Sequence, residues 1–297
     1  MKCFYPFFKS TAEGVVAFPC GRCHSCRASQ SMIWSLRMHL ESLYYNENAF
    51  VTLTYANEFL PEYNSLMPSH LQGFFKRLRR KLPYKIRYFA CGEYGDRFGR
   101  AHYHAIIFGL KKSDFHLIDE AWKFGLTHTE VPSQEAFQYV AGYVTKKIGK
   151  VSDWKLKNPN QIPPFQRCSL GLGLRFIMEQ VPFFTNVLQI GENVRYIGRY
   201  LRNKLAEKFG ILEKVKENGL KLLSADLQTI LSEFYYYGNE LPDVALKLDK
   251  FADYRAAWQW KYRGYIDDFI ARMKLRLQTY RSSNESAENF RINRGYT

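Results

Sequence analysis

The segment AHYHAIIFG, from Ala101 to Gly109, constrains the fold more than any other part of this chain. Its β-branched and aromatic residues predict a strand, and a similar run from Ile86 to Glu93 precedes it across a turn-rich stretch. The two runs therefore predict an antiparallel hairpin. Because alternate residues of a strand point to opposite faces, we expect His102 and His104 on one face and Tyr103 on the other.

Two imidazoles on one face of a strand form a candidate metal site, because neutral imidazole is a common metal ligand. One register of the hairpin places Glu93 opposite His102 or His104, whereas a shift by one residue would turn this carboxylate to the other face. Two histidines and a carboxylate suit Mg²⁺ or Mn²⁺ with open positions, although zinc would also bind. Taken alone, a His-x-His pair is more often structural than catalytic.

The remaining pattern predicts an α+β fold with a central antiparallel sheet flanked by helices and a mostly helical C-terminal part. A capping box of Ser69 and Gln72 predicts the start of one helix. The other expected elements are helices at 29–45, at 114–123 and from Ser133 to about Gly149, and strands at 50–55 and 125–131. The expected domains are a Cys-rich element at 1–30, a module at 31–155 and a helical region at 156–297.

Four N-terminal cysteines form a second candidate metal site. Cys3, Cys20, Cys23 and Cys26 have the spacing C-x16-C-x2-C-x2-C, and four thiolates can close a tetrahedral zinc site. His24 could replace one of these thiolates. The alternatives are free cysteines in a tight loop or a redox relay.

A pair of tyrosines forms the third candidate site. In the stretch YVAGYVTKK, Tyr139 and Tyr143 are four residues apart, so a helix places both phenols on one face. Lys146 follows Tyr143 by three residues, close enough to contact a phosphate or lower the pKa of a phenol. Tyrosine needs a nearby cation or base to act as a nucleophile. For an isolated pair at this spacing, core packing is the more common role.

The chain is strongly basic, with 43 Lys and Arg against 28 Asp and Glu and a formal net charge of +15. Such a charge favours polyanions, either a nucleic acid or an anionic membrane face. No apolar run approaches the roughly 18 to 20 residues of a spanning helix, and the first residues lack a signal-peptide pattern. We therefore expect a soluble intracellular protein. The sequence also lacks a G-x-x-x-x-G-K-[ST] segment and hence a recognisable helicase motor.

Basic residues near the predicted hairpin are candidates for phosphate contacts with a nucleic acid. A solvated basic face is an equally weighted alternative for those on the helix. Tyr94 and Tyr103 could stack on unpaired bases, although core positions are more common for such aromatic residues. The candidate basic residues are Lys76, Arg77, Arg79 and Arg80 on the helix, and Arg97 and Arg100 in the hairpin connection.

Together these segments resemble the HUH endonucleases, whose signature is a hydrophobic strand, then His-hydrophobic-His, then a Tyr-x-x-Lys helix. The paired tyrosines resemble the replication initiators of small single-stranded DNA phages, and the PCGxCxxC block looks like the start of initiators in the gokushovirus group of Microviridae. Tyr103 and Gly142 depart from the usual pattern. Further similarities to that group lie at residues 92–95, 168–173 and 193–196.

The resemblance implies a rolling-circle replication initiator that nicks single-stranded origin DNA, forms a 5′-phosphotyrosine and a free 3′-OH, and later rejoins strands. It implies Mg²⁺ or Mn²⁺ on His102, His104 and Glu93, and structural zinc on the four cysteines. Tyr143 would act first and Tyr139 in the second transfer, supported by Lys146 and Lys147. Host helicase and polymerase would be partners, and the host cytoplasm the location.

Two alternatives to this interpretation remain open at the sequence level. One is a transposase or relaxase of the HUH type, against which the Cys-rich N-terminus and the modest length argue. The other is a non-catalytic, zinc-containing nucleic-acid-binding protein in which the histidines and tyrosines are structural.

Overall fold

The computed structural model describes residues 2–95, 99–147, 159–241, 245 and 249–292, with the backbone alone described for 134, 135, 143–147 and 273–292. The chain forms two compact units. The larger comprises residues 27–215, and the smaller comprises residues 1–26 together with 216–297. The division by sequence into 1–30, 31–155 and 156–297 stays a prediction.

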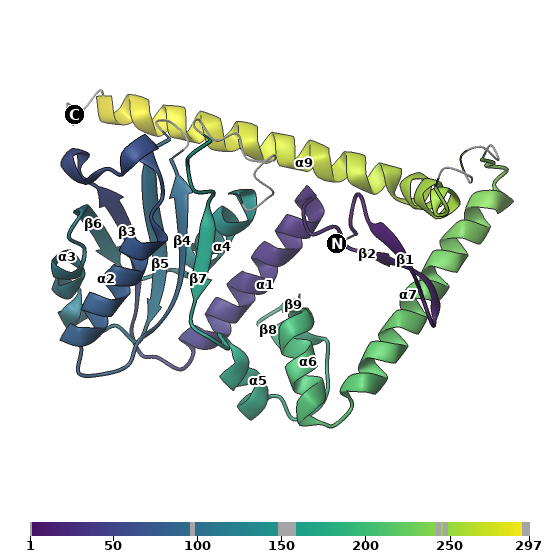
Figure 1. Cartoon of the computed structure of the whole chain (residues 1–297), viewed down its shortest axis with the longest axis horizontal. Coiled ribbons are helices and arrows are strands. Elements are labelled where there is room, and N and C mark those ends of the chain that lie inside the picture. Colours follow the sequence, from purple (N-terminus) through teal and green to yellow (C-terminus); the bar gives the residue numbers. More distant parts are fainter. Residues whose placement is uncertain (1, 96–98, 148–158, 242–244, 246–248, 293–297) are drawn as a thin grey trace. The chain divides into compact units, whose positions relative to one another are not determined.

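A five-stranded antiparallel sheet forms the centre of the larger unit (Figure 1). Its strand order is β6-β3-β5-β4-β7, and every neighbouring pair is antiparallel. The predicted α+β fold with a central antiparallel sheet is thus confirmed, with β7 as an added edge strand. The strands are β3 (Asn48–Tyr55), β4 (Arg87–Tyr94), β5 (Ala101–Phe108), β6 (Gly125–Glu130) and β7 (Phe165–Cys168).

Helices cover both faces of this sheet (Figure 1). On one face lie α2 (Pro68–Lys81) and α3 (His116–Ala121), which share a core with Tyr103. On the other face, α4 (Gln134–Lys147) and Met38 of α1 (His24–Ser42) share a core with strand residues such as Phe50 and Phe108. The alternation of side chains along β3, β4 and β5 supplies both cores at once, because each strand presents apolar residues to both faces.

The register of the β4–β5 hairpin is the one that gathers the candidate ligands. Glu93 lies opposite His102, and Cys91 lies opposite His104. On the other side of β5, Thr52 of β3 lies opposite His104. A shift by one residue would move the buried Tyr103 to the opposite face, so packing fixes this register.

The start of α2 differs from the prediction. The helix begins at Pro68, Met67 is its N-cap residue, and no side chain caps it. The capping box proposed for Ser69 is therefore wrong. Proline favours the first position of a helix because its φ is already helical and its missing N–H would have no partner there.

The segment that follows β7 is tied to α1 by two buried side chains. Arg37 donates from Nε to the carbonyl of Leu172 at 2.9 Å, and the carboxylate of Glu41 accepts the N–H of Gly173 at 2.7 Å. Gly173 has a φ of +73°, and a Cβ there would lie 2.9 Å from the Arg37 carbonyl, so glycine is required. The glycine-rich stretch at 168–173 is thus a structural junction.

The rest of the larger unit packs on the N-terminal part of this junction. A third core joins Leu36 and Leu40 of α1 to α5 and α6. The elements here are α5 (Leu174–Gln180), β8 (Val187–Ile190), β9 (Asn193–Tyr196) and α6 (Gly198–Lys208), and short 3₁₀ turns lie at Asn57–Phe59, Glu62–Asn64 and Lys112–Asp114.

The smaller unit combines a hairpin with long helices. Strands β1 (Phe7–Thr11) and β2 (Gly14–Phe18) pair antiparallel, and the helices are α7 (Leu212–Tyr236), which begins in the larger unit, and α9 (Ala252–Ile292). Phe8 and Trp258 belong to its core. The predicted helical C-terminal part is confirmed. Within the described residues, none of the helices has the length and apolar character that a membrane span requires.

Candidate functional site

Glu93, His102 and His104 form a buried cluster at one end of the β4–β5 hairpin. The Oε1 atom of Glu93 lies 2.9 Å from Nε2 of His102 and 3.2 Å from Nε2 of His104. Glu93 is 2% exposed and His104 is 6% exposed. The predicted grouping of these three side chains on one face is therefore confirmed.

The outer nitrogens of both imidazoles are held by the sheet. Nδ1 of His102 lies 2.9 Å from the carbonyl oxygen of Arg100, and Nδ1 of His104 lies 3.0 Å from Oγ1 of Thr52. Since a carbonyl can only accept, Nδ1 of His102 carries the proton, and Nε2 of neutral His102 directs a lone pair at Glu93. Two facing acceptors need a cation between them, which is either a proton or a metal ion.

The donor set fits a divalent metal ion. The three ligand atoms lie within 4.8 Å of one another. Neighbouring ligands at about 2.1 Å from an octahedral ion are about 3.0 Å apart, close to the distances from Glu93 to the two histidines. Hydrogen bonds to the outer imidazole nitrogens are also typical of metal-ligating histidines. The cluster can thus hold a metal ion, with imidazole and carboxylate as ligands.

Helix α4 brings a tyrosine beside this cluster. The ring centroid of Tyr139 lies 5.9 Å from that of His104 and 6.1 Å from that of Phe50. Tyr139 is 44% exposed, so solvent reaches its ring. Tyr143, Lys146 and Lys147 follow on the same helix, but their side chains lie outside the described residues.

The four N-terminal cysteines form a second cluster, in the smaller unit. Cys3, Cys20, Cys23 and Cys26 place their sulfur atoms within 4.8 Å of one another, as the spacing predicted. The β1–β2 hairpin closes the loop between Cys3 and Cys20, and Cys26 lies in the first turn of α1. His24 is exposed and does not belong to this group.

The geometry of the cysteine cluster also fits a metal ion. Sγ of Cys3 lies 3.8 Å from Sγ of Cys23, and sulfurs at about 2.3 Å from a tetrahedral zinc ion are about 3.8 Å apart. Backbone N–H groups of Phe4 and Cys20 donate to Cys23 and Cys3, respectively. The hydrogen bond with Cys3 lowers the pKa of Cys23, whereas burial raises the pKa of Cys26. Clustered thiols that accept N–H donors are prepared for a cation.

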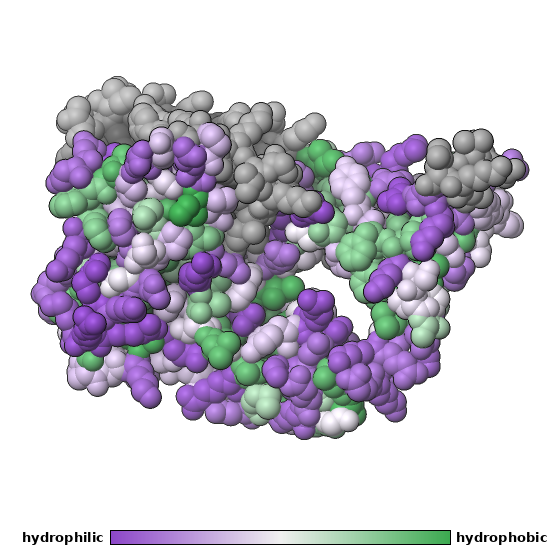
Figure 2. Space-filling model, viewed as in Figure 1, coloured by the Kyte–Doolittle hydropathy of each residue, from purple (hydrophilic) through white to green (hydrophobic). Residues whose placement is uncertain are grey.

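The basic residues predicted to contact phosphates differ in their surroundings. Hydrophilic residues gather over α2 and α3 in the view of Figure 2. Lys76, Arg79 and Arg80 are exposed on α2. Arg77 instead donates to the Ala121 carbonyl at 2.8 Å, and Arg100 donates to the Tyr55 carbonyl at 2.6 Å.

Three further candidates for nucleic-acid contact have other outcomes. Arg97 lies outside the described residues. Tyr94 and Tyr103 are 5% and 0% exposed, so they belong to the core and offer no ring for stacking.

Two supporting groups of the metal cluster were not predicted from the sequence. They are Thr52 and the Arg100 carbonyl, which contact the outer histidine nitrogens. Thr52 is recognisable only once β3 is known to pair with β5. The Arg100 carbonyl carries no side-chain signal at all.

Comparison with known proteins bears on the region that carries the site. Residues 48–148 match the family model of the replication-associated protein ORF2. Replication-associated protein ORF4 of Chlamydia phage 1 is 29% identical over 256 residues, which is 76% of this chain. Replication-associated protein ORF2 of Spiroplasma virus 4 is 33% identical over 54% of the chain, and VP4 of Bdellovibrio phage phiMH2K is 30% identical over 46%.

The matches confirm the predicted resemblance to replication-associated proteins of the Microviridae type. The chain spans 64%, 57% and 50% of the lengths of these three relatives, less than two thirds in each case. The span matched by the family model runs from β3 to the end of α4 and so contains the Glu93 cluster and both tyrosines. No solved structure matches the chain.

Proposed function

We propose that this relative of the microviral replication-associated proteins is a rolling-circle replication initiator that nicks single-stranded origin DNA with a tyrosine nucleophile. The observation that carries the proposal is the position of Tyr139 on α4, with its ring 5.9 Å from that of His104 in the buried Glu93 cluster. A phenol next to a metal-binding set is the arrangement that this reaction needs.

The reaction breaks one phosphodiester and forms another ester. The tyrosine oxygen attacks the scissile phosphorus, the 3′ oxygen leaves, and the chain keeps the 5′ phosphate on its phenol. The leaving oxygen takes up a proton and becomes the free 3′-OH that a polymerase extends. Because the phosphotyrosine ester retains the energy of the broken bond, rejoining needs no nucleotide triphosphate.

The residues of the proposed site have separate roles. Glu93, His102 and His104 would hold Mg²⁺ or Mn²⁺. Such an ion, when bound, offsets negative charge that develops on the phosphate oxygens. Tyr143 is proposed as the first nucleophile because Lys146 follows it by three residues, and Tyr139 as the nucleophile of the second transfer. The cationic side chains of Lys146 and Lys147 would favour the phenolate form of a tyrosine on this helix.

Other parts of the proposal concern binding and location. The origin strand would meet Lys76, Arg79 and Arg80 on α2 and the arginines of the β4–β5 connection, Arg97 and Arg100. Cys3, Cys20, Cys23 and Cys26 would hold structural zinc. Host helicase and polymerase would supply strand separation and extension in the host bacterial cytoplasm.

A cleavage assay tests the proposal. Labelled origin single strands are mixed with the protein and Mn²⁺ and separated on a denaturing gel. We expect a protein–DNA adduct that survives denaturation and is absent in the Tyr139→Phe/Tyr143→Phe double variant. Tyr196→Phe, at an exposed tyrosine of the same unit, is the matched control and should keep the adduct. Absence of cleavage with every divalent ion would favour the non-catalytic nucleic-acid-binding alternative.

Single substitutions test the order of the two tyrosines. If Tyr143 acts first, Tyr143→Phe abolishes the initial nick and Tyr139→Phe keeps it but blocks rejoining. The reverse result would assign the first attack to Tyr139, whose ring lies beside His104. A nick that yields a new closed circle from a tandem origin substrate distinguishes an initiator from a transposase or relaxase.

A further inference from the structure

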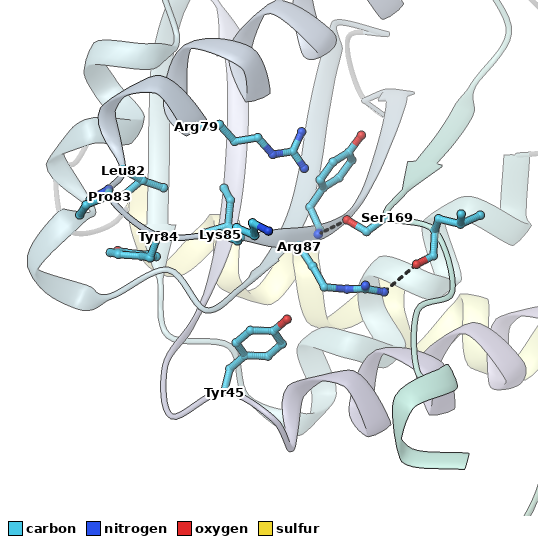
Figure 3. A pocket seen from close by; sticks show the side chains of 11 residues that line it. Tyr45, Arg79, Leu82, Pro83, Tyr84, Lys85, Arg87 and Ser169 are labelled. Carbon is cyan, nitrogen blue, oxygen red and sulfur yellow. Dashed lines mark hydrogen bonds between the residues drawn. The ribbon is translucent and has the colours of Figure 1, made fainter. Parts of the chain in front are cut away.

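A shallow groove lies where the connection after α2 reaches the start of β4 (Figure 3). Its volume is about 790 Å³. Three separate parts of the larger unit line it: residues 79–88, Tyr45 after α1, and the residues Ser169 and Leu170 after β7. No residue of the Glu93 cluster belongs to its described lining.

Positive charge gathers on one side of this groove. Figure 3 shows Arg79, Lys85 and Arg87 in a row, with Tyr45 below Arg87. Arg87 pairs with Glu41 at 2.7 Å and donates to the Leu170 carbonyl at 2.8 Å, so its charge is offset and it holds the groove wall. Arg79 and Lys85 are exposed, and across the described chain Lys85 forms no ion pair. The net charge of the groove therefore rests on Arg79 and Lys85.

Aromatic and apolar surface lies next to these cations. The hydroxyl of Tyr84 donates to Asp114 and accepts the N–H of Lys111, so the ring is held in place. Leu170 is 93% exposed beside it, in a segment whose backbone is tied down by Arg87. Fixed apolar faces beside exposed cations bind single strands, because bases stack on the rings and phosphates contact the cations.

We propose that this groove is a second subsite for single-stranded DNA, in which Arg79 and Lys85 contact phosphates and Tyr84 and Leu170 contact bases. The identity of the ligand as DNA rests on the proposed function, whereas the basic and aromatic lining does not. A duplex would satisfy the cations alone, because its stacked bases have no free faces for Tyr84.

The subsite is separate from the metal cluster. Arg87 at the groove and Glu93 in the cluster are six residues apart on β4, which corresponds to about 20 Å along a strand. At about 3.4 Å per nucleotide, this distance matches roughly six nucleotides. A strand held at both places is anchored away from the scissile phosphate, which raises its affinity without a new contact at the reacting atoms.

Binding in the absence of divalent ions tests the subsite independently of cleavage. The probe is a fluorescent dT oligonucleotide, and its Kd is measured by anisotropy over a series of salt concentrations. We expect Lys85→Gln to weaken binding and to reduce the slope of log K against log salt by about 0.7, the value for one phosphate contact on a single strand. Lys123→Gln, at an exposed lysine outside the groove, changes the net charge equally and should leave the slope unchanged.

Two further variants separate stacking from charge. Tyr84→Leu should weaken binding about five-fold or more, whereas Tyr84→Phe, which keeps the ring, should bind as the wild type does. The loss in Lys85→Gln should be the same in a His102→Ala/His104→Ala background, because sites about 20 Å apart act independently.

Several results would overturn the subsite. Equal slopes for Lys85→Gln and Lys123→Gln would show diffuse attraction, and equal binding of Tyr84→Leu and Tyr84→Phe would exclude stacking. A duplex probe that loses as much affinity in Tyr84→Leu as the single strand would also contradict it. A missing protein–DNA adduct in the cleavage assay would instead count against nicking and leave these binding results unaffected.

Discussion

The two metal-binding clusters are built in different ways. Glu93, His102 and His104 are side chains of two paired strands, and the hydrogen bonds of the sheet set their spacing. The four cysteines come from the segment before β1, the segment after β2 and the start of α1. The sheet can keep the first cluster in shape without an ion, whereas the second depends on the ion to join its segments.

Their ligands differ in the same sense. Imidazole and carboxylate bind divalent ions that exchange and leave positions open for phosphate oxygens, whereas four thiolates enclose a metal completely. We therefore expect the sheet cluster to serve chemistry and the cysteine cluster to serve folding. The following variants separate these roles.

Removal of the cysteine-bound metal should have the largest effect. One zinc per chain is expected in protein purified without chelator, and Cys23→Ser should lose it and unfold the N-terminal segment of the smaller unit. The binding free energy of a structural zinc, about 10 kcal/mol or more, is coupled to folding. Elemental analysis and protease sensitivity report both effects. Cys168→Ser, outside the cluster, should keep the zinc, and a zinc-free wild type that resists protease would contradict this assignment.

Loss of a sheet ligand should affect activity more than folding. His104→Ala should reduce the nicking rate at least about a hundred-fold, because charge on the phosphate oxygens is no longer offset. The thermal midpoint should change by only a few degrees, since β4 and β5 keep their hydrogen bonds. His128→Ala, at an exposed histidine on β6, is the control. A His104→Ala protein that nicks normally would remove the cluster from the reaction.

Loss of the hydroxyl at Thr52 should have a smaller effect on the same cluster. Thr52→Val keeps the shape of the side chain but removes the contact with Nδ1 of His104. We expect the Mn²⁺ concentration for half-maximal nicking to rise about 10- to 100-fold, and Thr52→Ser to restore it. Thr54→Val, at the position opposite His102, serves as the control. Equal Mn²⁺ requirements for Thr52→Val and wild type would mean that the sheet does not orient His104.

The smallest effect is expected at Tyr103, between the two histidines. Its hydroxyl contacts that of Tyr55 at 2.8 Å and accepts the N–H of Met67 at 2.8 Å, and burial raises its pKa to about 12. Tyr103→Phe leaves these partners unsatisfied, so the free energy of unfolding should fall by about 1–3 kcal/mol in urea titrations. The Mn²⁺ requirement for nicking should stay unchanged. A changed requirement with unchanged stability would give this face of the sheet a role in the site.

The sequence allowed prediction of the parts that local pattern determines. Alternation of side chains was sufficient for the two histidines and, with one choice of register, for Glu93. Cysteine spacing was sufficient for the second cluster, because a short loop keeps its ligands together. Both inferences rest on contacts within a single hairpin or loop.

Contacts between distant segments could not be predicted in the same way. Arg77 and Arg100 had the charge expected of phosphate ligands, but tertiary contacts direct them to the carbonyls of Ala121 and Tyr55. The groove needs Tyr45, residues 79–88 and Leu170, which only the strand order brings together. At α2, Pro68 prevailed over the side chain of Ser69, a competition that the capping pattern alone does not resolve.

Mass spectrometry of the trapped protein–DNA adduct tests the central claim most directly. The adduct formed with Mn²⁺ is digested with protease and nuclease, and the modified peptide is sequenced. We expect a nucleoside 5′-phosphate on Tyr143 or Tyr139 of α4, and no modified peptide from the His102→Ala/His104→Ala protein. A nucleotide attached to any other residue, or cleavage without any covalent peptide, would contradict the tyrosine mechanism.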